Sequence, residues 1–306
     1  MTPKHRTSRS GMLCLMVAAS AFVSCIRVDY EECPPLSVDI VVKDKNYANV
    51  NKVDLEDAVA EDLPFRSYVG NLTYALVNAH TGDTVLWEPL FDVPAGITTY
   101  HVDFPTSIPF GTYVFTVWGG LADDEPLRQG GDSLDLHPGG IVGGDPYLQC
   151  DTLIYDYRHN THTVNMERIK GKLIIETEHL PAVAVSSTNN VSNIRTRVAP
   201  DFQYGGAAKL TRQSDWRTPG DYKVWKTVLA PSIGDKRSVL DLDFQDASGN
   251  VLTALLPKDV NITMKRNSLT VLRYIWAWND DEQRYAWTIL MLVDDNWEVV
   301  HEMVLN

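Results

Sequence analysis

Residues 269–293 read LTVLRYIWAWNDDEQRYAWTILMLV and predict a β-hairpin. Residues 269–278 and 285–293 are apolar runs, rich in the aromatic and β-branched side chains that favour strands. Residues 279–283, which lie between them, are polar and typical of a turn. The hairpin indicates a β-rich chain, and the remaining sequence is interpreted outward from it.

Tryptophan is the second notable feature of this hairpin. Side chains two residues apart in a strand share a face, so Trp276 and Trp278 lie together, with Trp287 on the returning strand. We expect most indole rings to lie in a core or in cross-strand pairs, and the functional alternative is a platform for sugar rings. The chain has eight tryptophans: Trp87, Trp118, Trp216, Trp225, Trp276, Trp278, Trp287 and Trp297.

Short alternating strands separated by turns continue upstream of the hairpin. In residues 38–42 and again in 173–177, apolar side chains recur at every second position, as in a strand with one face on a core. No long amphipathic helix interrupts them, which favours antiparallel Greek-key sandwiches. The other predicted strands are residues 72–76, 84–87, 100–104, 113–117, 148–157, 161–166, 191–198, 222–229, 239–244, 251–256 and 297–305, and the predicted loops are 46–62 with a short helix, 121–147 and 203–221.

Length and alternation together predict two domains. The chain has 306 residues, which suits two domains of ordinary size, and the alternation restarts near residues 167–171. We therefore predict an all-β fold with an N-terminal β-sandwich over residues 36–166 and a C-terminal β-sandwich over residues 167–306. The hydrophobic content of 44% is ample for packed cores.

The N-terminus has the pattern of a lipoprotein signal peptide. Residues 1–10 are basic, residues 11–23 form an apolar run of about 13, and Phe22-Val23-Ser24-Cys25 is similar to a lipobox. A retained membrane helix is the alternative, but a spanning helix needs roughly 20 apolar residues. We expect cleavage after residue 24, lipidation of Cys25 with chains such as palmitate, and an acidic tether over residues 25–35.

The net charge limits the class of partner. The formal charge is −13, and losing residues 1–24, which hold three basic and no acidic residues, would take it to −16. Such a surface repels phosphate backbones, so nucleic acid is not an expected partner.

The four cysteines have different expected fates. Cys14 leaves with the signal peptide and Cys25 is lipidated, so Cys33 and Cys150 remain in an exported, oxidising setting. We predict a disulfide between these two, and the alternative is a pair of buried free thiols. Neither has a Cys or His partner at metal-ligand spacing, which argues against a metal site.

Two short motifs carry a resemblance to a known family. One is the lipidated Cys25 followed by an acidic tether with Asp29-Tyr30-Glu31-Glu32 and then Cys33-Pro34; the other runs from Gly111-x-Tyr113 to Trp118-Gly119-Gly120-Leu121. Together they resemble the fimbrial anchor lipoproteins of the Bacteroidales, the FimB type of type V pilus proteins. The resemblance implies two transthyretin-like sandwiches, a surface-exposed site on the outer membrane, and a fimbrial stalk subunit as partner.

The same resemblance implies strand exchange, in which an extended segment of one subunit fills a groove in its neighbour. The candidate segment is residues 297–306, and a fixed edge strand is its alternative. A stalk or tip subunit would share the fold, and a stalk would need proteolytic trimming. A surface lipoprotein that binds host or bacterial glycans is a further alternative. The exchange residues would be Trp297, Val299, Val300 and Val304, and the possible cut sites are Lys43, Lys45, Lys52 and Arg66.

The sequence lacks several short catalytic motifs, although a Ser-His-Asp triad built from distant residues has no such motif and stays open. There is no G-x-S-x-G elbow, no H-E-x-x-H and no phosphate-binding glycine loop, so we expect no enzyme activity and no cofactor. His137 stands alone in a predicted loop, where we expect it to be solvated. His159 and His162 would point to opposite faces of a strand, which disfavours a shared metal.

Overall fold

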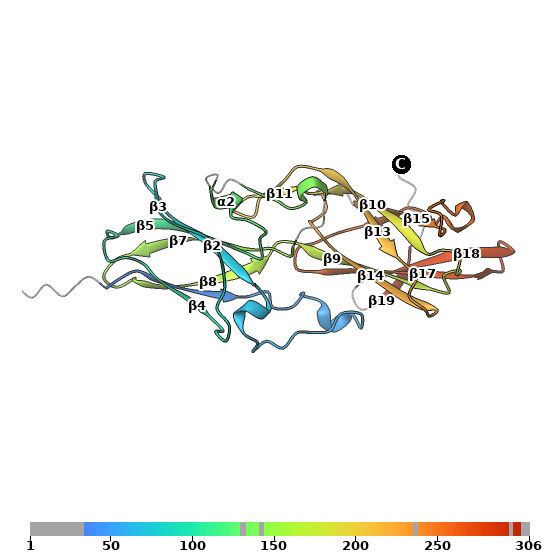
Figure 1. Cartoon of the computed structure of the whole chain (residues 1–306), viewed down its shortest axis with the longest axis horizontal. Helices are drawn as coiled ribbons and strands as arrows, with labels where there is room; N and C mark the ends of the chain where they lie inside the picture. Colours follow the sequence, from blue (N-terminus) through green and yellow to red (C-terminus); the bar gives the residue numbers. More distant parts are fainter. Residues whose placement is uncertain (1–33, 129–132, 141–143, 235–237, 294–295, 301–306) are drawn as a thin grey trace, which may run out of the picture. The chain divides into compact units, whose positions relative to one another are not determined.

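Strands account for nearly all of the regular structure. The computed structural model describes residues 34–300 apart from 129–132, 141–143, 235–237 and 294–295 (Figure 1). Its strands form four sheets, which confirms the all-β sandwich class predicted from the alternation. The helical elements of this part of the chain are single turns: η2 (Val50–Lys52), η3 (Phe65–Ser67), α2 (Glu125–Arg128), η4 (Pro138–Gly140) and η5 (Thr253–Leu255). None of the described helices is long and apolar enough to cross a membrane.

The first sheet folds on itself into two layers. Its order is β3-β2-β5-β7-β8-β1-β4, and β7 meets β8 through only two residue pairs, Tyr147 with Arg168 and Leu148 with Glu167. Beyond that corner the strands diverge and face each other. The strands are β1 (Ser37–Val42), β2 (Asn71–Asn78), β3 (Thr84–Asp92), β4 (Tyr100–Asp103), β5 (Gly111–Gly119), β7 (Tyr147–Tyr155) and β8 (Thr161–Arg168).

The alternating residues of this sheet meet in one hydrophobic core, which we call the N-terminal core. Strand β1 lies between β8, to which it is parallel, and β4, to which it is antiparallel. Its Val38 and Ile40 are fully buried. They face side chains of the other layer across the sandwich, as period-2 alternation requires. The core includes Val38, Ile40, Leu72, Phe115, Leu153 and Val164.

Two further sheets form the second sandwich. Parallel pairing of β9 with β17 sets the centre of the five-stranded sheet β14-β9-β17-β18-β19, which faces the four-stranded sheet β13-β10-β15-β16. The strands are β9 (Gly171–Glu178), β10 (Ser186–Ile194), β13 (Ala208–Asp215), β14 (Tyr222–Leu229), β15 (Ser238–Gln245), β16 (Val260–Ile262), β17 (Leu269–Asn279), β18 (Arg284–Val293) and β19 (Asn296–Val299). A small third sheet joins β6 (Leu134–Asp135), β11 (Arg197–Val198) and β12 (Tyr204–Gly205).

The second hydrophobic core, the C-terminal core, lies between these two sheets. It contains Leu173, Val191, Leu240 and Tyr274, and it is closed at one end by Trp118 and other side chains from the first part of the chain. The first residue of β9, Gly171, has to be glycine, because a Cβ there would lie 2.2 Å from the Lys265 carbonyl oxygen. The predicted domain boundary at residues 167–171, where the alternation restarts, is thus a place where the backbone passes close to that of Lys265.

Residues 44–57, which we call the strap, run from β1 onto the outer face of the second sandwich. Tyr47, Val50 and Val53 pack there against Ile174, Leu269 and Val271 in a third apolar cluster. The Asn49 side chain donates to the Leu269 carbonyl at 2.9 Å and accepts from the Leu269 N–H at 2.8 Å. The predicted loop with a short helix is therefore a packed cover that ties the first sandwich to the second.

Two sequence predictions in the second sandwich are wrong. Residues 203–221, predicted as a loop, contain the eight-residue strand β13. Residues 251–256, predicted as a strand, form one isolated bridge at Val251 and then the turn η5. The short strand β16 was not predicted at all.

Candidate functional site

The C-terminal segment is an edge strand in the structure. Strand β19 pairs antiparallel with β18, and no strand of the described chain pairs with its other side. The pairing of β19 at the edge of the sheet matches the alternative of a fixed edge strand. Exchange of this strand with a partner stays a prediction. Trp297, Val299 and Val300 lie in or directly after this strand, and Val304 lies outside the described residues.

Side chains hold β19 in addition to the ladder. The Arg273 guanidinium lies 4.2 Å from the centroid of the Trp297 ring, within the range of a cation–π contact. Val300 packs against the C-terminal core, and its N–H donates to the Ile289 carbonyl at 2.8 Å. Trp297 and Val300 therefore fix opposite faces of the strand.

Arg273 in turn neutralises a carboxylate that is buried in the sheet. Its Nε lies 2.5 Å from Glu176 Oε1, and the Glu176 side chain has no exposed surface. The Tyr222 hydroxyl donates to the other Glu176 oxygen. Burial, followed by this bond to a carboxylate, raises the pKa of Tyr222 well above its usual value. A chain of contacts thus runs from β14 through β9 and β17 to Trp297.

The predicted lipidation and disulfide sites are only partly visible. Cys25 and Cys33 lie outside the described residues, so both predictions stay untested. Cys150 has no disulfide with another described residue and accepts a hydrogen bond from Thr116 Oγ1 at 3.4 Å on β5. Burial is the main reason that the pKa of its thiol is raised, which makes it a poor nucleophile.

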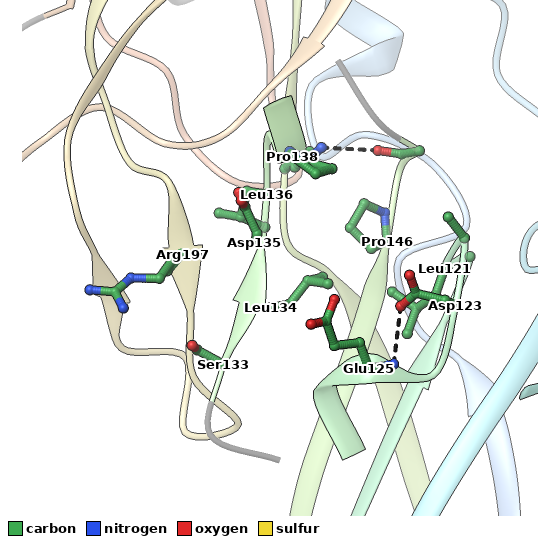
Figure 2. Close-up of a pocket in the computed structure, with 14 residues that line it drawn as sticks. Leu121, Asp123, Glu125, Ser133, Leu134, Asp135, Leu136, Pro138, Pro146 and Arg197 are labelled. Atoms are coloured by element: carbon green, nitrogen blue, oxygen red, sulfur yellow. Dashed lines mark hydrogen bonds between the residues drawn. The ribbon is translucent and has the colours of Figure 1, made fainter. Parts of the chain in front are cut away.

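The predicted loop over residues 121–147 lines a cleft of about 510 Å³. Figure 2 shows Leu121 and Asp123 on one side of it and the β6 residues Leu134 and Asp135 on another. The Asp123 carboxylate accepts from the Glu125 N–H at 3.0 Å, so this acid caps its own turn. No group of three His, Cys, Asp or Glu side chains in the described ranges is arranged to hold a metal.

A buried lysine at this cleft was not predicted from the sequence. Lys170 is only 1% exposed, and its Nζ donates to the Gly144 carbonyl at 3.2 Å. Burial lowers the pKa of Lys170 to about 8. Lys170 lies between Ile169 and Gly171, at the corner where one sandwich ends and the other begins. Because this corner is outside any strand, the hydrophobic pattern of the sequence does not indicate that the side chain is buried.

His137 corrects another expectation. It was predicted to be solvated, but it is buried, and its Nε2 accepts a hydrogen bond from the Ala230 N–H at 3.1 Å. The loop that holds it packs onto the second sandwich, so a polar side chain there satisfies a backbone donor. His159 lies in the connection before β8, where its Nδ1 is 2.9 Å from the Asp156 carboxylate, and His162 lies in β8, where its Nε2 donates to the Ile154 carbonyl at 3.1 Å.

Comparisons with known proteins show the fold. No protein-family model matches the sequence, and no curated protein matches it. Among solved structures, a protein named as a putative adhesin from Bacteroides ovatus is 13% identical, with 91% of this chain and 98% of that chain covered and a TM-score of 0.55. Proteins named as putative polysaccharide binding proteins from Bacteroides thetaiotaomicron are 12% identical, with 87% and 99% covered and a TM-score of 0.54.

A fimbrial protein also resembles the chain, less closely. The fimbrial anchor protein Mfa2 from Porphyromonas gingivalis is 12% identical, with 88% of this chain and 99% of that chain covered and a TM-score of 0.48. At these identities the likeness establishes a shared fold, and function has to come from the site.

Proposed function

We propose that this chain is an outer-membrane lipoprotein that anchors or initiates a fimbrium by exchanging a strand with a fimbrial subunit. Lipids on Cys25 would hold it to the membrane, and β19 would be the segment exchanged. The observation that carries the proposal is the position of β19: it is the last described element and lies at a sheet edge with one neighbour. Leaving that edge breaks one ladder together with the contacts of Trp297 and Val300, and a partner's strand can replace the ladder.

The fold likeness to a protein named as an adhesin supports a role in adhesion at the cell surface. The sequence supports the membrane end of the proposal, because a lipobox-like segment precedes Cys25. The proposed mechanism is the binding of a fimbrial subunit and involves no catalytic side chain.

A cross-strand disulfide provides the sharpest test of strand exchange. Because Val300 N–H bonds to the Ile289 carbonyl, these two form a hydrogen-bonded pair, and the next pair, Leu290 with Val299, is the closer type. Cα atoms in such pairs lie about 4.5 Å apart, within the range of a disulfide. The double variant Leu290→Cys/Val299→Cys should fold and lock β19 in place.

If exchange anchors the fibre, oxidised cells that carry the double variant should shed fibres into the medium, and a reductant should restore retention. Leu290→Cys alone is the matched control and should retain fibres under both conditions. Deletion of residues 297–306 should give a folded lipoprotein that fails to hold fibres. Normal fibre retention by the oxidised double variant, with its disulfide verified by intact mass, would refute a role for β19.

Sizing of the mature protein separates an anchor from a stalk. An anchor stays full length after Cys25, whereas a stalk would be cut after its first strand. Lys43 is held by its backbone to Met166 and paired with Glu167 at 2.5 Å, while Arg66 is exposed in η3. We expect a full-length, palmitate-labelled product that Cys25→Ala releases from the membrane. A fragment that begins after Arg66 would identify a stalk instead.

A further inference from the structure

Four aromatic side chains at the end of the β17–β18 hairpin form a continuous surface, which we call the aromatic shelf: Trp276, Trp278, Tyr285 and Trp287. The strand register sets Trp276 opposite Trp287 and Trp278 opposite Tyr285, so all four project from one face. The rings of Trp276 and Tyr285 lie nearly parallel, 19° apart in plane, with centroids 6.2 Å apart. Trp278 stands almost perpendicular to Tyr285, at 80° and 5.5 Å.

The inner end of the shelf belongs to the C-terminal core. Trp287 stacks on Phe244 with ring centroids 5.3 Å apart, and its Nε1 donates to the Leu255 carbonyl at 2.9 Å. Trp276 contacts Trp287 at 5.0 Å. The core thus fixes the inner rings, and they form a rigid base for the outer ones.

The outer end of the shelf is open to solvent. Trp278 is 51% exposed and Tyr285 is 57% exposed. The hairpin extends here past its neighbours, because β9 pairs with β17 only up to Ile275 and β19 pairs with β18 only from Leu290 onward. Figure 1 shows the β17–β18 hairpin reaching beyond the adjacent strands. Adjacent exposed aromatic rings on a projecting hairpin form an apolar surface of the kind that marks a binding site.

The turn helps to orient the indole of Trp278. The Trp278 Nε1 donates to Asp280 Oδ1 at 3.0 Å, which favours one orientation of the ring. Asn279 Oδ1 accepts from the N–H groups of Asp281 at 2.9 Å and Glu282 at 3.1 Å, so the turn is closed by its own side chains. Pre-ordered rings lose little conformational entropy when a ligand binds to them.

We propose that the aromatic shelf binds neutral carbohydrate, with a sugar ring lying against the exposed rings of Trp278 and Tyr285. A pyranose presents a face of C–H groups, whose slight positive charge suits the negative face of an aromatic ring. The exposed rings of Trp278 and Tyr285, 80° apart in plane, supply two adjoining surfaces, and Trp276 stacks on Tyr285 behind them.

Charge selects neutral ligands over anionic ones. Asp280, Asp281 and Glu282 adjoin the shelf, and the nearby Arg284 is already paired with Glu282 at 2.7 Å. Uronic or sulfated sugars would meet net negative charge there, in a chain of formal charge −13. The exposed rings of Trp278 and Tyr285 lie at the turn end of the hairpin, whereas β19 pairs with β18 only over residues 290–293, so the proposed sugar contacts and the strand exchange use different residues.

Affinity electrophoresis of the full-length protein tests this site. Native gels containing dextran, yeast mannan or galactomannan should retard the wild-type protein in at least one case, and heparin should not. Trp278→Ala/Tyr285→Ala should weaken the retardation about tenfold or more, because two ring contacts are lost. Tyr285→Phe keeps the ring and should bind nearly as well as wild type.

Trp87→Ala is the matched control, because Trp87 is an exposed tryptophan on β3, far from this hairpin in sequence. It should leave the retardation unchanged. Three outcomes would each overturn the proposal: no retardation by any neutral polysaccharide, unchanged retardation of the double variant, or stronger binding to heparin. Loss of self-association in the double variant without any polysaccharide binding would assign the shelf to contacts between copies of the chain.

Discussion

At the scale of single residues, the ion pair between Arg273 and Glu176 should be the most sensitive point of the second sandwich. Arg273→Leu leaves a fully buried carboxylate with only the Tyr222 hydroxyl as a described polar partner. Removing one member of a buried pair typically costs about 3–5 kcal/mol of unfolding free energy. Urea denaturation measures the loss.

The exposed pair of Arg284 with Glu282 provides the control for this prediction. Both of its side chains are largely in solvent, so Arg284→Leu should cost roughly 0–1 kcal/mol. Equal losses in the two variants would show that burial does not set the energy of the Arg273 contact.

The buried Lys170 should make the free energy of unfolding increase with pH in the alkaline range. Burial lowers its pKa to about 8 from 10.5, so between pH 8 and pH 10 the unfolded chain binds a proton that the native chain has lost. Stability therefore rises with pH across this window, by up to on the order of 3 kcal/mol. Urea midpoints at pH 7, 8, 9 and 10 should show that rise in wild type and a smaller one in Lys170→Met.

At neutral pH, Lys170→Met should also be more stable than wild type, because the variant no longer buries a charge. Tyrosine ionisation affects both proteins equally above pH 10, so the difference between them isolates Lys170. Identical pH profiles would contradict the lowered pKa.

Burial of individual polar residues could not be predicted from the sequence. Both faces of β9 are covered, so Glu176 sits in a run of buried residues and alternation does not reveal what covers it. The partners of Glu176 and His137 come from segments tens of residues away, and one sequence carries no signal for such contacts.

At the scale of elements, β19 should be held mainly by Trp297. Trp297→Ala removes the ring over Arg273 and the packing against the strap cluster, whereas Val299→Ala changes a side chain that is 48% exposed on the same strand. We expect amide hydrogen exchange in β19 to accelerate about tenfold or more in the first variant and little in the second. The same acceleration in both would mean that the ladder alone retains the strand.

Strands with a clear apolar period were predicted from the sequence, and β13 shows why others were not. On its inward face, Leu210 is apolar but Ser214 is polar. Ser214 belongs to a buried hydrogen-bonded group with Ser187 and Asn189, to which Trp216 also donates. Polar pairs satisfy this part of the sheet, so the hydrophobic period that identifies a strand is missing.

At the scale of the whole molecule, the strap links two sandwiches that the sequence predicts as separate domains. Residues 46–62, predicted as a loop with a short helix, are irregular apart from η2, but their apolar spacing does not indicate which surface the strap covers. The structure shows that the strap covers Ile174 and Val271 on the outer face of the second sandwich. The strap gives the two sandwiches packed side-chain contacts in addition to the covalent chain that joins them.

Tyr47 is where this tie can be tested. Its ring lies between the Arg168 guanidinium, 4.0 Å away, and the Lys172 ammonium, 4.9 Å away, and its hydroxyl donates to Asp145 at 3.2 Å. We expect wild type to unfold calorimetrically in one transition and Tyr47→Ala to unfold in two, because the halves lose the contacts that couple them. Val59→Ala, in the exposed part of the following segment, should keep one transition. A single transition in Tyr47→Ala, merely moved to lower temperature, would mean that Trp118 and the other first-part side chains in the C-terminal core couple the sandwiches without the strap.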